Sequence, residues 1–457
     1  MQDELSDKRI VIFGLARQGK ALARFAVGVG AKVIISDMRT EEQLRGSLDE
    51  IADLPVELVL GEHPLSLLST TDVVAISGGV PADSPIVQEA YRRGITVTND
   101  SLEFMKRTPS TVVGITGSAG KTTTTALTGL MFQATGRRTW VGGNIGQPLI
   151  SDLATMEPGD IVIQELSSFQ LELWTKSPPV AAVLNVTPNH LDRHKNMAAY
   201  TRAKSNILRF QTHQDVAVLS ADDPGAEYME RVTPARVRKF SLEHRISDGA
   251  FLSDEQIWLT DGKDSWSLCH KDEIPLRGRH NILNVQAAAL LADSLGVGKE
   301  AMRSAIRDFS GVEHRLELVR MINGVQYVND SIATAPERAI AAIDSFTEPL
   351  ILLAGGRDKD MVWESWAGIV SARVRQVVLF GELGRQLEEM LRDCKTANEQ
   401  SPQIFRVKSL DEAVILASSN ARPGDVVLLA PGGASFDAFV DFSARGEKFR
   451  QLVNDLA

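Results

Sequence analysis

The chain has 457 residues, 43% of them hydrophobic and 24% charged, and its formal net charge is −10. This composition predicts a soluble protein of several domains, and the acidic balance argues against a nucleic-acid or membrane surface. The two cysteines fit neither a metal nor a disulfide spacing, which favours a reducing compartment. The N-terminus is too acidic and polar for a signal peptide, and no apolar run approaches the roughly 18 residues of a membrane helix. We therefore expect a cytoplasmic protein.

Residues 9–37 follow the order strand, glycine turn, helix and strand, which is the outline of a Rossmann βαβ unit. The turn contains Gly14 and Gly19, but Ala16 replaces the middle glycine of the dinucleotide pattern, and the second strand ends at Asp37. A nucleotide-sugar diphosphate is compatible with this turn, and NAD is less favoured because its pyrophosphate needs close approach of the backbone. A plain turn without a ligand stays open.

A glycine pair, Gly78-Gly79, follows the next apolar strand, at the sheet edge where ligands of parallel α/β folds lie. After one more strand we end the first domain at about residue 100. Residues 101–110 are interpreted as the linker to the next domain.

A phosphate-binding turn is predicted at Gly117 to Gly120, between an apolar strand and a helix-forming run. Glycines let backbone N–H groups close on phosphate oxygens, and the helix N-terminus and Lys121 add positive charge. Thr122 is placed to offer its hydroxyl to Mg²⁺. Because Ile115 stands where the strict P-loop pattern has glycine, this is a variant P-loop. It indicates ATP or GTP binding, and the alternative is a glycine turn with a surface lysine.

Three further residues of this domain are candidates only in context. Glu165 ends an apolar strand, where a carboxylate could face a metal ion or simply be solvated. His190 follows a buried strand, and a lone histidine is more often structural. Lys204, in a helix, is by default a solvated lysine. Residues 214–277 alternate short strands and loops without evident chemistry.

Asn281 and Asn284 share one helix face and could read an adenine edge, or Asn281 could cap the helix. A change of composition near residue 311 marks a third domain. Its four apolar strands end in glycine or polar residues, which predicts another parallel sheet with a site at the strand ends.

Taken together, these motifs resemble the Mur ligase family over the whole chain and in order, and most of all its D-glutamate-adding members. The motifs are the P-loop, ELSSFQLE, NVTPNHLDRH, AYTRAK, GRHNILN, HRLE, VNDSIAT and APGGASFDAFVDFSARGEKF. The resemblance implies an α/β fold of three domains. These are a Rossmann-like UDP-binding domain at 1–100, a central P-loop ATPase domain with a parallel sheet at 101–311, and a C-terminal Rossmann-like domain for the amino acid at 312–457.

The implied reaction is ATP-driven amide formation. The γ-phosphoryl group of ATP moves to the carboxylate of UDP-N-acetylmuramoyl-L-alanine, the amine of D-glutamate attacks the acyl phosphate, and ADP and phosphate are released. ATP and Mg²⁺ are the implied cofactors, with two metal sites and with Mn²⁺ as an alternative ion. The partners are these small molecules, without nucleic acid or membrane, and we expect a monomer.

The resemblance also implies roles for individual residues. The catalytic residues are Lys121, His190 and Lys204. The ATP positions are Gly117, Ser118, Ala119, Gly120, Lys121, Thr122, Thr123, Asn281, Asn284, Arg315 and Asp330. The metal ligands are Thr122, Glu165, His190 and Lys204, which this family carbamylates. The UDP-substrate positions are Leu15, Ala16, Asp37, Met38, Arg39, Ser77, Asn144 and His190. The D-glutamate positions are Thr334, Lys359, Ser435 and Phe442.

The chain departs from the family where Asp-Ser-Lys-Ala-Thr-Asn is common, because it has Ile332 for the lysine and Ala335 for the asparagine. The alternatives are a sibling ligase that adds another amino acid or a dipeptide, and a folylpolyglutamate synthetase, which lacks a first domain of this kind. A P-loop NTPase that acts as a binding switch is the alternative from another class.

Overall fold

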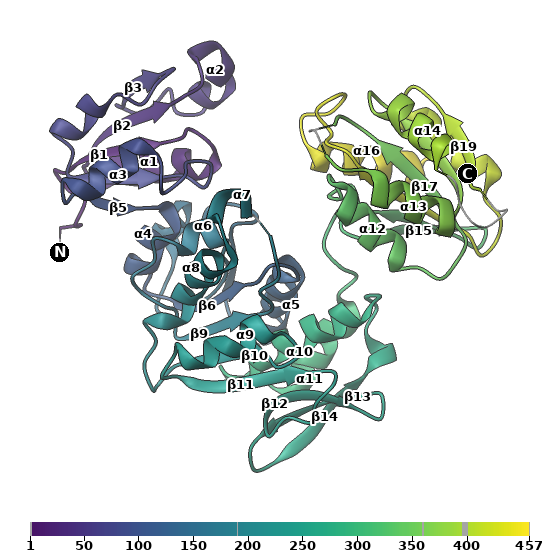
Figure 1. Ribbon diagram of the computed structural model, residues 1–457. Helices are drawn as coiled ribbons and strands as arrows, with labels where there is room; N and C mark the ends of the chain where they lie inside the picture. The colour runs from purple at the N-terminus through teal and green to yellow at the C-terminus, as the bar shows by residue number, and fades with distance from the viewer. Residues whose placement is uncertain (1, 190, 359–360, 395–400, 457) are drawn as a thin grey trace. The chain divides into compact units, whose positions relative to one another are not determined.

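The computed structural model describes residues 2–189, 191–358, 361–394 and 401–456 (Figure 1). The chain forms two compact units, Met1–Ile274 with Arg279–Phe309, and Pro275–Gly278 with Ser310–Ala457. The first unit contains two sheets and the second unit one, each covered by helices. The predicted α/β class with three parallel-rich domains is confirmed. We keep residues 100 and 311 as the proposed domain boundaries.

The first sheet is parallel, with the strand order β3-β2-β1-β4-β5. Its strands are β1 (Arg9–Phe13), β2 (Lys32–Asp37), β3 (Glu57–Leu60), β4 (Val73–Ile76) and β5 (Thr96–Thr98). Its helices are α1 (Arg17–Gly28), α2 (Glu41–Asp49), η1 (Leu65–Ser69) and α3 (Pro85–Arg92). The strand order reverses between β1 and β4, so the turns after these strands flank the switch point where ligands of such sheets bind.

The prediction of a linker at 101–110 is wrong for most of that segment. Residues Asp100–Arg107 form helix α4, whose N-cap Asn99 accepts a hydrogen bond from the backbone N–H of Leu102. Phe104 and Met105 are buried, and Phe104 is fully so. The segment is therefore part of the core that the two sheets of this unit share.

The central sheet has the order β14-β13-β12-β11-β10-β9-β6-β8-β7, parallel from β7 to β12 and antiparallel beyond. Its strands are β6 (Thr111–Thr116), β7 (Thr139–Gly143), β8 (Ile161–Glu165), β9 (Val180–Val183), β10 (Val216–Ser220), β11 (Arg236–Ser241), β12 (Asp248–Ser253), β13 (Gln256–Asp261) and β14 (Ser265–His270). Its helices are α5 (Lys121–Gln133), η2 (Leu149–Ser151), η3 (Leu153–Thr155), α6 (Ser168–Leu171), α7 (Leu191–His194), α8 (Met197–Arg209), α9 (Pro224–Tyr228), η4 (Met229–Arg231), η5 (Lys271–Glu273), α10 (Arg279–Asp293) and α11 (Lys299–Asp308).

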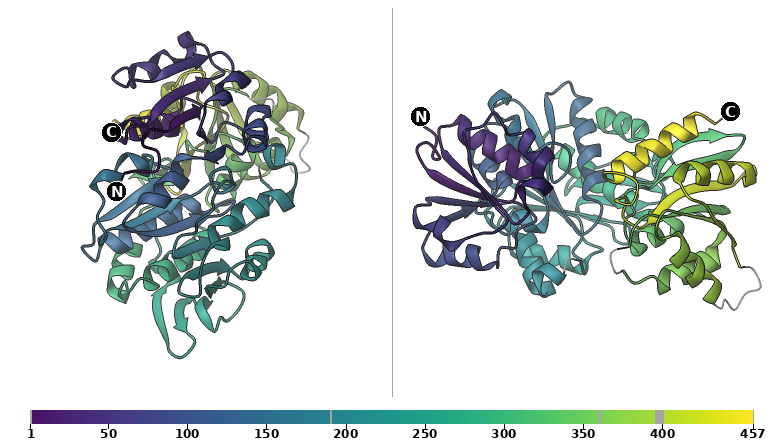
Figure 2. Two further views of the ribbon diagram at one scale, coloured as in Figure 1. Left: turned by 90° about the vertical axis from the view of Figure 1, so that its left-hand side faces the viewer. Right: turned by 90° about the horizontal axis from the view of Figure 1, so that it is seen from above.

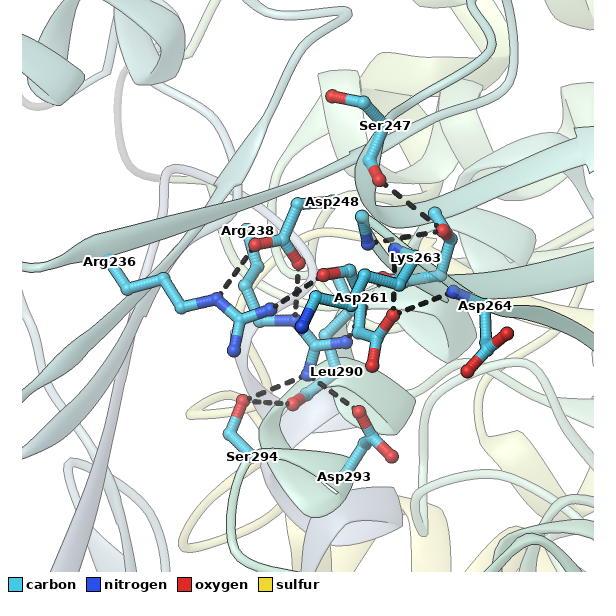
Figure 3. A network of polar contacts seen from close by, with 12 residues as sticks. Arg236, Arg238, Ser247, Asp248, Asp261, Lys263, Asp264, Leu290, Asp293 and Ser294 are labelled. Carbon is cyan, nitrogen blue, oxygen red and sulfur yellow. Dashed lines mark hydrogen bonds and ion pairs between the residues drawn. The ribbon is translucent and has the colours of Figure 1, made fainter.

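A buried arginine fixes the far end of α10 (Figure 3). The guanidinium of Arg238, on β11, donates to Oδ1 of Asp248 at 3.2 Å and to Oδ2 of Asp293 at 2.7 Å. Asp248 also accepts from Arg236, and Ser294 accepts from Arg238. The guanidinium of Arg238 is buried while the carboxylates of Asp248 and Asp293 are partly exposed, and the network ties α10 to β11 and β12.

The third sheet has the order β15-β16-β20-β17-β18-β19. Its strands are β15 (Glu317–Ile322), β16 (Val325–Asn329), β17 (Leu350–Gly355), β18 (Val374–Phe380), β19 (Gln403–Arg406) and β20 (Val426–Gly432). Among the strands described, only the pairing of β15 with β16 is antiparallel. The sheet has six strands where the sequence predicted four. One core packs α12 (Pro336–Asp344), α13 (Glu364–Arg373) and α14 (Gly384–Asp393) on the sheet, and another packs α15 (Leu410–Asn420) and α16 (Phe442–Asn454) (Figure 2).

No helix within the described ranges is both long enough and apolar enough to cross a membrane.

Candidate functional site

The predicted phosphate-binding turn lies between the carboxyl end of β6 and Lys121, the first residue of α5. Gly120 is the N-cap of α5 and has φ of +82°, in the left-handed region that favours glycine. A Cβ atom at this position would lie 2.3 Å from Oδ1 of Asn284. Thr122 and Thr123 follow in the first helical turn, whose N–H groups and dipole favour an anion. The turn therefore has the backbone of a phosphate site.

Two residues that the sequence analysis missed brace this turn. Asn185 accepts from the backbone N–H of Ala119 at 2.8 Å and donates to the carbonyl oxygen of Ala119 at 3.2 Å. The hydroxyl groups of Ser118 and Tyr200 are 2.9 Å apart. Asn185 closely follows the buried strand β9, and Tyr200 lies in the motif AYTRAK, so the sequence carried a signal for both residues, although neither was singled out.

Lys204 is buried, 2% exposed, so its default interpretation as a solvated lysine is wrong. Its amine donates to the carbonyl oxygen of Gly117 at 2.9 Å and to the hydroxyl of Thr116 at 3.3 Å. Burial lowers the pKa of Lys204 well below its usual range, and the charge of Lys121 lowers it further, against an opposing effect of Glu165. The geometry therefore favours a neutral amine beside the phosphate turn.

Glu165 ends β8 and is also buried. Its Oε1 atom accepts from the side-chain amide of Asn144 at 2.8 Å, while its Oε2 atom has no hydrogen-bond partner in the part of the chain described. An unpartnered buried carboxylate oxygen is a hard donor of the kind Mg²⁺ prefers. Together with the hydroxyl of Thr122, this donor set fits a magnesium ion. His190, the remaining predicted ligand, lies outside the described residues.

The two asparagines of the adenine prediction lie on α10, which begins at Arg279. Asn281 is therefore inside the helix, and its interpretation as the N-cap is wrong. The side-chain amide of Asn284 donates to Oδ1 of Asn281 at 3.0 Å, and both side chains are buried. Thr124 of α5 donates to Oδ1 of Asn284 at 3.4 Å. The structure thus brings Asn284 to the phosphate turn and to α5, and the predicted contact of the two asparagines with adenine stays a prediction.

The first domain places several of its predicted residues at the turn after β1. The backbone N–H of Leu15 donates to Oδ2 of Asp37 at 2.8 Å, and Arg39 pairs with the same carboxylate. Burial alone would raise the pKa of Asp37, but the hydrogen bonds from Arg39 and Leu15 outweigh it and lower the pKa to about 2. Asp37 therefore holds the turn in shape. Ala16 and Met38 are exposed beside it.

Ser77 lies on the other side of the switch point, where its hydroxyl donates to the carbonyl oxygen of Phe13 at 2.9 Å. A Cβ atom on Gly14 would lie 2.1 Å from the hydroxyl oxygen of Ser77, so this turn requires glycine. Ser77 also lines a cavity together with Asp100 and Arg193. Burial raises the pKa of Asp100 to about 7.

In the C-terminal unit, the predicted residues follow the ends of β16 and β20. Asp330 accepts from the backbone N–H of Leu316 at 3.0 Å, next to Arg315. Thr334 is half-buried and Ser435 is buried, while Phe442 begins α16. Lys359 lies outside the described residues.

Arg445, another residue that the sequence analysis missed, ties these strand ends together. Its fully buried guanidinium donates to the hydroxyl and the carbonyl oxygen of Ser331 at 3.0 and 2.9 Å and to the carbonyl oxygen of Gly433 at 3.0 Å. Burial lowers the pKa of Arg445 to about 10, against the opposing charge of Asp437. Arg445 lies within the last of the quoted motifs, but an arginine in an amphipathic helix usually faces solvent, so the motif does not indicate that its guanidinium is buried.

Three family models match successive parts of the chain. They are the Mur ligase MurD-like N-terminal domain over residues 8–99, the Mur ligase middle domain over 115–292 and the Mur ligase glutamate ligase domain over 314–433.

Curated relatives match over the full length. The UDP-N-acetylmuramoylalanine–D-glutamate ligase of Clostridium botulinum strain Hall is 38% identical over 455 residues, which cover 100% of this chain and 98% of the relative. The enzyme of the same name from Clostridium kluyveri is 38% identical over 450 residues, 98% and 97% of the two chains.

Solved structures support the fold. The UDP-N-acetylmuramate-alanine ligase MurC of Thermotoga maritima has a TM-score of 0.60 at 18% identity and covers 98% of this chain and 99% of its own. FolC of E. coli, in complex with DHPP and ADP, has a TM-score of 0.57 at 15% identity but covers only 78% of this chain, against 92% of its own.

Proposed function

Because this chain belongs to the Mur ligase family, we propose that it catalyses the reaction for which its full-length relatives are named, the addition of D-glutamate to UDP-N-acetylmuramoyl-L-alanine. The reaction is a step of peptidoglycan synthesis. It consumes ATP, and we place it in the cytoplasm for that reason. The observation that carries the chemistry is the convergence of Lys121, Lys204 and the unpartnered oxygen of Glu165 on one glycine turn.

The turn provides what phosphoryl transfer needs, which is mainly positioning and charge neutralisation. The N–H groups of the turn and the first turn of α5 bind the phosphate chain, and Lys121 neutralises its β- and γ-phosphates. A carboxylate oxygen of the L-alanyl group attacks the γ-phosphorus, ADP leaves, and an acyl phosphate forms. The amine of D-glutamate then attacks the acyl carbon, the amide forms, and phosphate leaves with the loss of one proton.

Mg²⁺ would be held by Thr122 and Glu165 at one site, and by His190 with a carbamylated Lys204 at another; Mn²⁺ would suit the same oxygen ligands. When bound, the ions neutralise the charge that develops on the phosphoryl oxygens. Lys204 is suited to carbamylation because carbon dioxide adds only to a neutral amine, and burial keeps its pKa low. The modification turns a buried neutral amine into an anionic oxygen ligand, with the loss of one proton.

The other predicted residues are assigned to the substrates. Leu15, Asp37 and Ser77 shape the turn that would take the uridine diphosphate, with Ala16, Met38 and Arg39 exposed beside it. Asn144, whose side-chain amide donates to Glu165, would contact the acyl end of this substrate. In the C-terminal unit, Thr334, Lys359, Ser435 and Phe442 are assigned to D-glutamate. A lysine and hydroxyl groups suit a ligand with two carboxylates.

The acyl phosphate can be tested with UDP-N-acetylmuramoyl-L-alanine that carries heavy oxygen in its carboxylate. If this carboxylate attacks the γ-phosphorus, one heavy oxygen must appear in the released phosphate. Mass spectrometry of the phosphate reads this directly. Unlabelled phosphate, released at the rate of amide formation, would contradict the proposed mechanism.

A further inference from the structure

Two arginines of the C-terminal unit lie around one buried carboxyl group, that of Asp330. Its Oδ1 atom accepts from the backbone N–H of Leu316 at 3.0 Å, directly after Arg315. The N–H of Ile332 donates to the carbonyl oxygen of His314 at 3.1 Å. From the first turn of α12, the guanidinium of Arg338 lies 3.5 Å from the carbonyl oxygen of Ile332. These contacts bring three segments to the carboxyl end of β16.

The charges of this group do not balance. Burial raises the pKa of Asp330 to about 6, even though the N–H of Leu316 and the charges of both arginines favour its ionised form. The pKa of Arg338 is lowered, first by partial burial and then by the charge of Arg315. The charge of Arg315 thus acts on Arg338, whose side chain is exposed and whose guanidinium lies at the carbonyl oxygen of Ile332, and the single carboxylate of Asp330 cannot neutralise both arginines.

One donor of this group is also unused. The Nε atom of Arg315 is buried and has no hydrogen-bond partner among the described residues. Buried donors are almost always paired, and a planar guanidinium is suited to carboxylate and phosphate oxygens. An anion between the two arginines would satisfy both the donor and the charge.

We propose that Arg338 forms, together with Arg315, an oxyanion site at the carboxyl end of β16, which takes a carboxylate or phosphoryl group of the reactants. This inference rests on the proposed function for the identity of those reactants. The segment 330–335 has no cation of its own, because isoleucine stands at 332 where the family pattern has lysine. The guanidinium of Arg338, from helix α12, lies at the carbonyl oxygen of Ile332 and supplies a positive charge there.

The test compares Arg338→Gln, which keeps a donor but loses the charge, with Arg338→Lys, which keeps the charge. A double variant, Ile332→Lys with Arg338→Gln, returns a cation to the segment from the other position. Arg385→Ala is the matched control, since Arg385 is an exposed arginine of the same unit that pairs with Glu389. Turnover is measured with each substrate varied in turn, and calorimetry measures binding of D-glutamate, of ATP with Mg²⁺, and of inorganic phosphate.

We expect Arg338→Gln to raise one KM by roughly tenfold or more, as the loss of a charge-assisted contact does, with kcat changed less. Arg338→Lys and the double variant should recover most of the loss. A rise in the KM of D-glutamate alone assigns the anion as its carboxylate, and a rise in the KM of ATP with weaker binding of inorganic phosphate assigns it as a phosphoryl group. A rise in the KM of the UDP-substrate with unchanged binding of inorganic phosphate assigns it as the carboxylate of the L-alanyl group.

Unchanged KM values and unchanged binding in Arg338→Gln would overturn the proposal. So would a loss that neither lysine variant recovers, because the effect would then come from structure and not from charge. The calorimetric binding measurements do not depend on turnover. A wild-type protein that binds the ligands without ligating them would contradict the proposed function and still test the oxyanion site.

Discussion

The amines of Lys121 and Lys204 share one acceptor, the carbonyl oxygen of Gly117, at 3.0 and 2.9 Å. Two ammonium groups at one neutral oxygen would repel each other strongly in a buried site. This repulsion disappears if one of the two amines is neutral. Lys204 is the better candidate for the neutral amine, because burial lowers its pKa. Lys121 is then the cation of the phosphate turn, and Lys204 is the nucleophile for carbon dioxide.

We therefore expect Lys204→Ala to reduce turnover by roughly 100-fold or more, as the loss of a group that stabilises developing charge does. Short carboxylates such as acetate should restore part of the activity, since they supply the oxygen ligand that the carbamate would provide. Lys176→Ala is the control, because Lys176 also donates to a backbone carbonyl, that of Met105, but is exposed. Near-wild-type activity of Lys204→Ala would remove this lysine from the metal site.

Gly120→Ala should abolish ATP binding without unfolding the chain. The added Cβ would meet Oδ1 of Asn284 at 2.3 Å, so either the turn or the asparagine must move. Gly136→Ala is a matched control, because Gly136 has a similar φ of +76° but nothing within 4 Å of the added Cβ. Gly136→Ala should lower the free energy of unfolding only by the backbone strain, about 1 kcal/mol, and should leave ATP binding unchanged. Calorimetric titration with ATP and Mg²⁺ distinguishes them, and equal ATP affinity in both variants would contradict the packing argument.

Glu165→Gln should raise the Mg²⁺ concentration needed for half-maximal activity by roughly tenfold or more, because the amide keeps the shape but loses the charge of the carboxylate. Its Oε1 position can still accept from Asn144, so the fold should not change. Glu227→Gln serves as the control, since Glu227 pairs with Lys239 at the surface of the same domain. An unchanged Mg²⁺ dependence of Glu165→Gln would exclude this carboxylate as a ligand.

Asp37 should contribute to stability in a defined pH range. Its pKa is about 2 in the folded chain and 3.8 in a model peptide, so its contribution is fully present above pH 3.8 and is lost as the pH falls towards 2. The difference corresponds to about 2 kcal/mol at neutral pH. Asp37→Asn should therefore lower the unfolding temperature at pH 7, and the gap to wild type should narrow with acid. A gap that stays constant between pH 7 and pH 3 would contradict the assignment.

The sequence was sufficient for the family and for the main lines of the fold. The glycine turn before Lys121, the strand end at Glu165 and the strand end at Asp330 each lie where the alternation of strands and helices placed them. The family models and the full-length relatives confirm the resemblance read from the motifs. Local patterns suffice here because parallel strands bring their carboxyl ends to one edge.

What the sequence could not supply depends on burial and on contacts between distant segments. Nothing near Arg445 indicates that its guanidinium is buried against Ser331, more than a hundred residues away. Residues 101–110 look polar enough for a linker, yet the apolar side chains of α4 are buried in the core. Lys204 carries no sign of burial in its own helix, whose composition is ordinary. In each case the tertiary packing overrides what the local sequence suggests.

The measurement that tests the central claim most directly is ADP release in the presence of UDP-N-acetylmuramoyl-L-alanine and Mg²⁺, with each candidate amino acid added in turn. We predict turnover with D-glutamate alone. Turnover with a different amino acid would reassign the pocket of the C-terminal unit and retain the ligase mechanism. ADP release at the same rate without any amino acid and without the UDP-substrate would contradict the ligase, and would indicate a P-loop NTPase that hydrolyses ATP for another purpose.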